Sequence, residues 1–396
     1  MNTILNWSYR KIENTSLKFE RYLSTEINWN NKLIVIVGGR GVGKTTLMLQ
    51  QLKKNHTNNE SILYTSLDNL YFSKHSIIDL VEEFVALGGK HLFLDEIQKY
   101  SNWSIEIKNI HDNFPNLQLV LSGSSTTEIL KSEGDLSRRA IFYKMSGLSF
   151  REFLNINYEH DFESISLDDI IKNHKQISFG ISEKIKPIKE FNLYLKSGYY
   201  PFYNEDKEGY HQRLRQVINT VIEVDISAVH LIDYSAVLNI KKLLGIITEL
   251  VPFKPNVKRL SEQIGISRES FVKYLSYLEK AEVVNLLYAQ TKGIALLRKP
   301  EKIYLNNTNI SFALNNTIDV GNARETFFIN QIKQGHDLFF SDKGDFLVDN
   351  KFTFEVGGKN KTTKQIKGVK NAFIAADNIE FSNGNKIPLW LFGMMY

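Results

Sequence analysis

A glycine-rich turn between an apolar run and a helix-forming segment constrains this chain more than any other feature. The apolar run 33–37 leads into the sequence GGRGVGKTT, which begins at Gly38 and ends at Thr46. Glycines let the backbone curl so that several N–H groups point at one anion, and a helix that begins there adds the positive end of its dipole. The stretch therefore predicts a phosphate-binding loop that follows a buried strand.

The side chains of this loop predict a nucleotide and a metal ion. Lys44 is placed to reach the terminal phosphates, and the Thr45 hydroxyl is placed to ligate magnesium. We expect ATP as the nucleotide and Mg²⁺ as the metal. The residues expected to contact the nucleotide are Gly38, Gly39, Arg40, Gly41, Val42, Gly43, Lys44, Thr45 and Thr46.

A second apolar run ends in two acids. Residues 91–94 precede Asp95 and Glu96, and ligands of parallel sheets bind at the carboxyl ends of the strands. We expect Asp95 to hold magnesium through water and Glu96 to polarise the attacking water, because hydrolysis needs an oriented base near the γ-phosphate. The alternative is an ordinary strand end with exposed acids.

Two further apolar runs complete a repeating pattern. Residues 61–66 lie between the two motifs, and residues 117–125 follow them and end in hydroxyl side chains. Strands that alternate with helices predict an α/β fold with three layers and a mostly parallel sheet. Ser122 or Ser124 is the candidate to sense the γ-phosphate or position water, although small polar residues also end strands and cap helices.

Length and composition restrict the number of domains and the compartment. The chain has 396 residues and no cysteine, which predicts two or three domains and excludes disulfides and cysteine-based zinc sites. The amino terminus lacks the pattern of a signal peptide, and no apolar run reaches the roughly 20 residues that span a bilayer. We therefore expect a cytoplasmic protein without a membrane partner.

Positive charge is concentrated in one segment. The net charge is +5, and residues 254–302 hold ten lysines and arginines against five glutamates. A local excess of cations is typical of a surface that binds a polyanion. A solvated, lysine-rich surface is the alternative.

The same segment has the pattern of a winged helix-turn-helix. Leu260 and Ile264 are expected to face inward, Gly265 to make the turn and Ser267 to cap a second helix. Two strands around the loop QTKG are expected to form the wing. The residues expected to contact DNA are Arg268, Ser270, Lys273, Lys292, Arg298 and Lys299. Winged helices also serve as protein interfaces, so the pattern leaves both partners open.

Three acids near the carboxyl end have the layout of a restriction-type nuclease. Glu325 lies on an expected helix, and Asp345 and Glu355 lie on expected hairpin strands; such acids hold magnesium near a scissile phosphate. Nucleases of this type place a lysine two residues after the last acid, whereas here Lys359 is displaced. The misplaced lysine favours a nuclease-like fold that binds or assembles over one that cleaves.

Taken together, the motifs resemble bacterial and archaeal AAA-type ATPases that join an AAA domain to an uncharacterised restriction-nuclease-like domain. The resemblance is carried by the phosphate loop and by the stretches LDEIQ, LSGSS, SRRAIFYKMSGLSFREFL, YLKSGYYPFY and FEVGGKNKTTKQIKG. It implies a P-loop NTPase fold of the AAA type. It also implies that Arg138 or Arg139, just before the fifth strand, enters a neighbouring subunit's site, and hence a homo-oligomeric ring such as a hexamer. A surface pair of arginines is the alternative.

These observations predict four domains and one leading function. The expected domains are an ATPase domain (1–150), a helical lid or connector (151–235), a winged helix-turn-helix (236–318) and a nuclease-like domain (319–396). The leading hypothesis is a magnesium-dependent ATPase that couples ATP hydrolysis to DNA binding or remodelling, including branched DNA. The alternatives are an ATP-dependent assembly switch that acts on protein partners and an ATP-gated nuclease.

Overall fold

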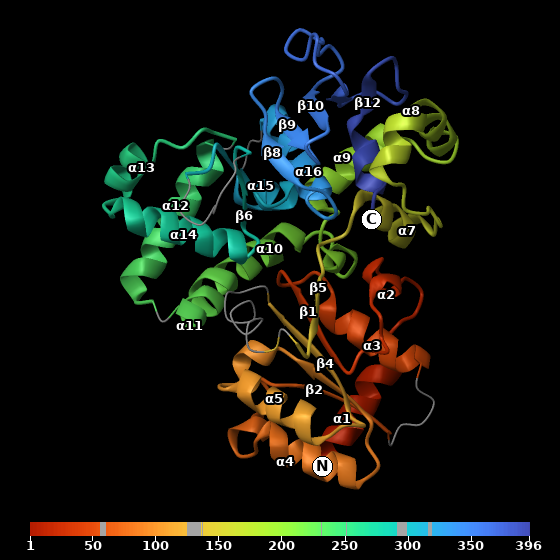
Figure 1. Ribbon diagram of the computed structural model, residues 1–396, viewed down its shortest axis with the longest axis vertical. Coiled ribbons are helices and arrows are strands. Elements are labelled where there is room, and N and C mark those ends of the chain that lie inside the picture. Colours follow the sequence, from red (N-terminus) through yellow and green to blue (C-terminus); the bar gives the residue numbers. More distant parts are fainter. Residues whose placement is uncertain are drawn as a thin grey trace. The chain divides into compact units, whose positions relative to one another are not determined.

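The chain forms two compact units. The computed structural model describes residues 1–55, 61–124, 136, 138–230, 232–250, 252–290, 299–315 and 319–396. Unit 1 is Met1–Gly147, red to yellow in Figure 1, and unit 2 is Leu148–Tyr396, which continues to blue. No helix within these described ranges has the length and apolar character needed to cross a membrane.

Unit 1 is built on a parallel sheet. Its strands are β1 (Leu33–Gly38), β2 (Ile62–Ser66), β3 (His91–Asp95), β4 (Gln118–Ser124) and β5 (Ile141–Lys144). Its helices are α1 (Asn2–Glu13), α2 (Leu23–Glu26), α3 (Lys44–Asn55), α4 (Ile77–Ala86) and α5 (Trp103–Asn113). The strand order is β2-β3-β4-β1-β5 and every pairing is parallel, which confirms the expected α/β class.

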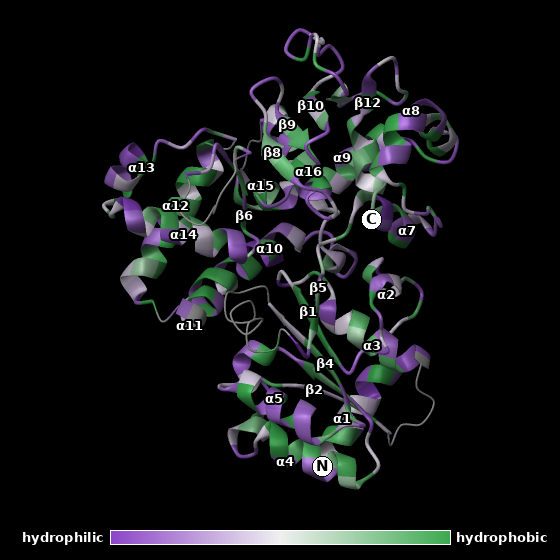
Figure 2. Cartoon of the chain, in the orientation of Figure 1, coloured by the Kyte–Doolittle hydropathy of each residue, from purple (hydrophilic) through white to green (hydrophobic). Residues whose placement is uncertain are grey.

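Helices cover the sheet of unit 1 as two pairs. Helices α1 and α3 pack together, as do α4 and α5, and Figure 1 shows the two pairs flanking the sheet. All six residues of β1 are buried, as expected for a central parallel strand covered on both faces. Figure 2 shows β1 as mainly hydrophobic, whereas β4, with the sequence QLVLSGS, ends in small polar residues. The polar residues at the carboxyl ends of β3 and β4 therefore mark a candidate site.

Unit 2 begins with helices and ends with a mixed sheet. The helices are α7 (Phe150–Tyr158), α8 (Leu167–Ser182), α9 (Pro187–Ser197), α10 (Tyr210–Thr220), α11 (Ser227–His230), α12 (Tyr234–Leu250), α13 (Val257–Ile264), α14 (Arg268–Lys280), α15 (Thr308–Leu314) and α16 (Val320–Ile332). The strands are β6 (Val284–Leu287), β7 (Lys302–Leu305), β8 (Leu338–Phe340), β9 (Phe346–Val348), β10 (Phe352–Gly357), β11 (Ala372–Ala376) and β12 (Lys386–Pro388). A π-helical turn, Val221–Ile226, joins α10 to α11.

The second sheet has the order β12-β11-β10-β9-β8. Strands β10, β11 and β12 pair in parallel, and β8, β9 and β10 pair in antiparallel fashion. One hydrophobic core joins this sheet to α16, to the closing 3-10 segment Leu389–Met394 and to α7, α8 and α9. The apolar residues Leu389–Met394 are thus buried. Helices from the segment predicted as a lid share the core of the second sheet.

The basic segment forms two helices and a two-stranded ribbon. Ser267 caps α14, because its Oγ accepts a hydrogen bond of 3.0 Å from the N–H of Ser270. Gly265 ends α13 with a φ of 82°, a backbone conformation that favours glycine. The ribbon is the antiparallel pair β6–β7. Leu260 and Ile264, expected to face inward, are buried, as are three apolar residues of α14: Phe271, Leu275 and Leu278.

Candidate functional site

The loop between β1 and α3 has the backbone that the sequence requires. Gly41 and Gly43 have φ values of 84° and 101°, which side chains disfavour. Gly38 is needed for a different reason, because a Cβ there would lie 2.2 Å from the carbonyl oxygen of Met145. The loop is therefore a tight cradle of backbone next to the end of β5, in which a larger residue at these glycines does not fit.

Lys44 occupies the centre of this cradle. Its side chain is only 7% exposed, and its Nζ donates hydrogen bonds of 2.8 Å and 2.9 Å to the carbonyls of Gly38 and Gly39. A buried ammonium group needs such acceptors. Phosphate oxygens can replace these carbonyls, so the lysine is held ready where the terminal phosphates of a nucleotide are expected.

Asp95 lies beside the loop, as the two motifs predicted. The Thr45 hydroxyl donates a hydrogen bond of 2.5 Å to Asp95 Oδ2. Strand β4 separates β1 from β3 in the sheet, so both motifs end at the same edge. Asp95 is 3% exposed. A hydroxyl and a carboxylate at this distance are the oxygen ligands that Mg²⁺ prefers, so the residues present fit the ion.

Two further hydroxyls hold the Asp95 carboxylate. Ser122, on the intervening strand β4, donates to Oδ1, and Tyr64, on β2, donates to Oδ2 over 2.8 Å. Burial and then the Asp95 charge raise the pKa of Tyr64 well above its usual value, so the phenol remains a donor. The structure therefore places Ser122 on Asp95, and it adds Tyr64, which the sequence analysis missed. Ser124 is buried at the end of the same strand.

Glu96 has a strained backbone. Its φ of 54° and ψ of 44° lie in the left-handed region, which is uncommon for a residue with a side chain. Its carboxylate accepts a hydrogen bond from Gln98 Nε2, and its own N–H donates to Asp95 Oδ1 over 3.0 Å. Strain of this kind persists where the surrounding structure fixes a residue, and it clusters at functional sites.

The two candidate arginines differ in their surroundings. Arg139 makes two hydrogen bonds of 2.8 Å to the carboxylate of Asp112 within its own unit, and the guanidinium lowers the pKa of that acid. Arg138 is exposed. Asp112 therefore engages the guanidinium of Arg139 in a bidentate ion pair. Of the two arginines, Arg138 is the one whose side chain is exposed.

Arg21 is a further residue that the sequence analysis missed. It is 5% exposed and donates to the Val42 carbonyl of the loop and, over 2.7 Å and 2.9 Å, to the carbonyls of Ser146 and Gly147. One buried guanidinium thus joins the phosphate loop to the last residues of unit 1. An isolated arginine between helices gives no pattern from which such a contact could be predicted.

Three of the candidate DNA-binding residues, Arg268, Ser270 and Lys273, lie on α14. Arg268, Lys273 and Lys299 are exposed, and Ser270 is half-buried with its backbone engaged in the Ser267 cap. Glu269 is exposed between the first of these residues and Ser270. Lys292 and Arg298 lie outside the described residues.

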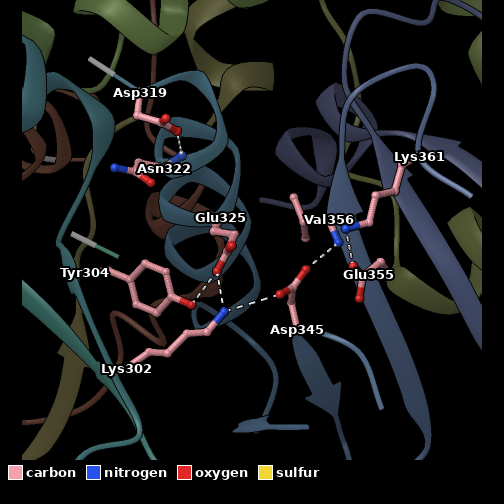
Figure 3. Close-up of polar contacts among 9 residues, drawn as sticks. All are labelled: Lys302, Tyr304, Asp319, Asn322, Glu325, Asp345, Glu355, Val356 and Lys361. Carbon is pink, nitrogen blue, oxygen red and sulfur yellow. Dashed lines mark hydrogen bonds and ion pairs between the residues drawn. The ribbon is translucent and has the colours of Figure 1, made fainter. Parts of the chain in front are cut away.

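A lysine lies between two of the three carboxyl-terminal acids. Figure 3 shows the ammonium group of Lys302 between Glu325 and Asp345, at 2.9 Å and 3.3 Å. The Tyr304 hydroxyl also donates to Glu325, over 2.7 Å. Among the residues that the structure describes, no group of three or more His, Asp and Glu side chains is arranged to hold a metal ion.

Glu355 is paired with a lysine other than the expected one. Lys361 makes the ion pair with this buried carboxylate, whereas Lys359 contributes its backbone carbonyl to Lys386 Nζ over 2.8 Å. Burial raises the pKa of Glu355, and the Lys361 contact opposes this shift. Lys361, two residues after Lys359, thus supplies the ammonium group that pairs with Glu355.

Two protein-family models match parts of the chain. Residues 30–154 match a model described as an AAA domain, and residues 188–320 match one described as a domain of unknown function, DUF8612. The parallel sheet, the phosphate loop and Asp95 lie within the first match. Unit 1 therefore contains an AAA-type P-loop domain.

Relatives share most of the chain at low identity. The uncharacterized protein MJ1637 of Methanocaldococcus jannaschii is 26% identical over 382 residues, which span 88% of this chain and 80% of that protein. The uncharacterized protein MJ1544 of the same organism is 24% identical over 359 residues, with 85% and 74% covered. AMPPCP-bound DnaA from Aquifex aeolicus is 18% identical, with 70% of this chain and 88% of that chain covered and a TM-score of 0.27; a score this low carries no argument.

Proposed function

We propose that this protein is a magnesium-dependent ATPase whose site is the loop 38–46 together with Asp95 and Glu96. The observation that carries the proposal is the 2.5 Å hydrogen bond between the Thr45 hydroxyl and Asp95, beside the buried Lys44. Motifs 50 residues apart in the sequence form one cluster of a cation, a hydroxyl and a carboxylate. Phosphate chains with magnesium need this combination.

Each residue has a role in the proposed reaction. Backbone N–H groups of the loop and Lys44 bind the β- and γ-phosphates, and Thr45 and Asp95 hold Mg²⁺, which neutralises charge on the phosphates when bound. Glu96 orients the attacking water and accepts its proton. Ser122 and Tyr64 fix the orientation of Asp95, since a carboxylate with its donors in place loses little freedom when the metal binds.

Three substitutions test this assignment. Glu96→Gln is expected to bind nucleotide with unchanged affinity and to lose turnover by a factor of 100 or more, on the order expected for a general base. Lys44→Ala is expected to lose nucleotide binding. Glu82→Gln, an exposed acid on α4, is the matched control. Unchanged phosphate release by Glu96→Gln excludes its role, and no heat on titration of the wild-type protein with Mg-ATP excludes the proposal itself.

We also propose that the cycle is coupled to DNA through α13, α14 and the β6–β7 ribbon. The support is the local charge excess and the exposure of Arg268 and Lys273 on one helix. Such cations neutralise backbone phosphates and release counterions, so the affinity is expected to fall steeply with salt. Remodelling of branched DNA is the finer form of this proposal.

Fluorescence anisotropy with labelled duplex and branched DNA tests the coupling. Arg268→Ala combined with Lys273→Ala is expected to weaken binding and to reduce the slope of log K against log salt by about 2. Lys172→Ala combined with Lys175→Ala, on the exposed side of α8, is the matched control with the same change in charge. Two outcomes favour instead an assembly switch that acts on protein partners. One is DNA binding that neither double variant weakens, and the other is ATP hydrolysis that no DNA stimulates.

We propose further that the protein assembles as a ring in which Arg138 reaches the site of the next subunit. The support is that Arg139 is held by Asp112 within its own unit, whereas Arg138 is exposed. A guanidinium delivered from a neighbour stabilises charge in the transition state.

A further inference from the structure

A lysine takes a central place in the carboxyl-terminal acid cluster. Lys302 comes from β7, Glu325 from α16, and Asp345 lies directly before β9, so the three charges come from separate parts of unit 2 (Figure 3). The ammonium lies 2.9 Å from Glu325 Oε2 and 3.3 Å from Asp345 Oδ1. All three side chains are mostly buried, with 22%, 18% and 16% exposed.

Charge in the cluster is close to balanced. The carboxylates of Glu325, Asp345 and Glu355 face the ammonium groups of Lys302 and Lys361, which leaves an excess of one negative charge. Burial alone lowers the pKa of Lys302, but the charges of Glu325 and Asp345 outweigh burial and raise the pKa above its usual value, so the lysine stays protonated.

The carboxylates retain oxygen atoms that another cation could use. Glu355 is 1% exposed, and its Oε2 accepts no hydrogen bond from any described residue. Asp345 Oδ2 accepts a hydrogen bond from the N–H of Val356, over 2.9 Å. A buried oxygen without a donor is costly, and its presence beside two further carboxylates indicates a region of negative potential that Lys302 and Lys361 neutralise only in part.

We infer that Lys302 is a built-in cation that takes the position of a metal ion between Glu325 and Asp345, so that this acid cluster excludes divalent ions as long as Lys302 is in place. A divalent ion requires oxygen ligands within about 2.1 Å for Mg²⁺, and the ammonium lies between the two oxygens that such an ion would share. The cluster is therefore an ionic tie between β7, α16 and β9. Removal of the lysine leaves three carboxylates against one ammonium, an excess of two negative charges that matches a divalent cation.

Nucleotide-free Lys302→Met tests the inference with Mn²⁺ as the probe. The variant keeps the length of the side chain and removes its charge. We expect its melting temperature to be lower than that of the wild-type protein and to rise by about 3 °C or more when millimolar Mn²⁺ is added, because a bound ion stabilises the folded state. Isothermal titration calorimetry is expected to detect one additional Mn²⁺ site in the variant. A Mn²⁺ ion bound at Asp95 contributes equally to the titrations of the wild-type protein and of Lys302→Met, so it cancels in the comparison.

Matched variants make the result specific. Lys343→Met removes an exposed lysine of the same unit and is expected to gain no Mn²⁺ site, as is Lys302→Arg, which keeps the charge. The double variant Lys302→Met, Glu325→Gln is expected to lose the gained site. A folded Lys302→Met, or Lys302→Ala if the first variant does not fold, that gains no ion overturns the inference. Mn²⁺ binding by the wild-type protein that Glu325→Gln or Asp345→Asn abolishes overturns it equally.

Discussion

Asp95 is the residue on which the proposed chemistry depends most directly. Its carboxylate accepts hydrogen bonds from Thr45, Tyr64 and Ser122 and from the N–H of Glu96. Four donors on two oxygens fix the orientation of a buried charge and compensate for its loss of water. A ligand that is already oriented requires no further ordering when a metal ion arrives.

The Tyr64 contact leads to a prediction. Tyr64→Phe removes one donor from Asp95 and leaves the ring in place. We expect the Mg²⁺ concentration for half-maximal ATP hydrolysis to rise by about 10- to 100-fold, the usual effect of losing a partner of a metal ligand. Metal titrations of phosphate release measure it. Tyr9→Phe, on an exposed part of α1, is the control, and an unchanged Mg²⁺ requirement in Tyr64→Phe contradicts the proposed role.

The approach of two strands at Gly38 is a constraint at the level of elements. A Cβ on this residue would lie 2.2 Å from the Met145 carbonyl oxygen, so Gly38→Ala is expected to destabilise the protein by about 1–3 kcal/mol through overpacking. Gly245→Ala is the matched change, since α12 leaves open space there and alanine favours a helix by about 0.5–1 kcal/mol. Chemical denaturation measures the free energy of unfolding of both variants. Equal changes in the two would show that the close approach of Gly38 to Met145 does not exclude a side chain.

Asn309 joins three helices of unit 2. It is fully buried; its Oδ1 accepts from the N–H of Tyr199 and the hydroxyl of Tyr210, and its Nδ2 donates to the Leu195 carbonyl over 2.9 Å. Asn309→Ala leaves these groups unpaired, so we expect a loss on the order of 3 kcal/mol in the free energy of unfolding. Asn173→Ala, exposed on α8, is expected to change it by less than about 0.5 kcal/mol. A similar midpoint for both variants in urea would refute this role.

Local patterns predicted the elements, and the two motifs predicted that Asp95 lies beside the phosphate loop. Contacts of single polar residues across the chain were not predicted. The strand that leads into the phosphate loop, the acid at the end of β3 and the cap at Ser267 follow from neighbours in the sequence, and the structure confirms all three. Tyr64 and Lys302 were missed because a single polar residue in a strand has no periodic signal, and its partners lie 31 and 23 residues away. The packing of α7–α9 against the second sheet was missed for the same reason, since an apolar helix face does not name its partner.

The proposed ring leads to a prediction for the whole molecule. Arg138→Ala is expected to lower kcat by at least about 1000-fold, the usual effect of losing an arginine finger, with nucleotide binding unchanged. Mixing Arg138→Ala with Lys44→Ala is expected to restore part of the activity, because the second protein supplies the arginine and the first supplies an intact loop. Arg139→Ala is the control and is expected to lose only the surface pair with Asp112. A mixture without recovery contradicts a finger that acts between subunits.

The core of unit 2 takes side chains from both ends of that unit, with Phe150 and Phe191 packed in the same cluster as Trp390 and Phe392. During synthesis, unit 1 can complete its sheet soon after its last strand leaves the ribosome, since all of its strands are then available. The second core cannot form until about 250 further residues have been synthesised, and its early aromatic side chains remain exposed until then. Such an interval favours aggregation of nascent chains and engagement by chaperones, so limits on production of this protein in a foreign host are expected to arise in unit 2.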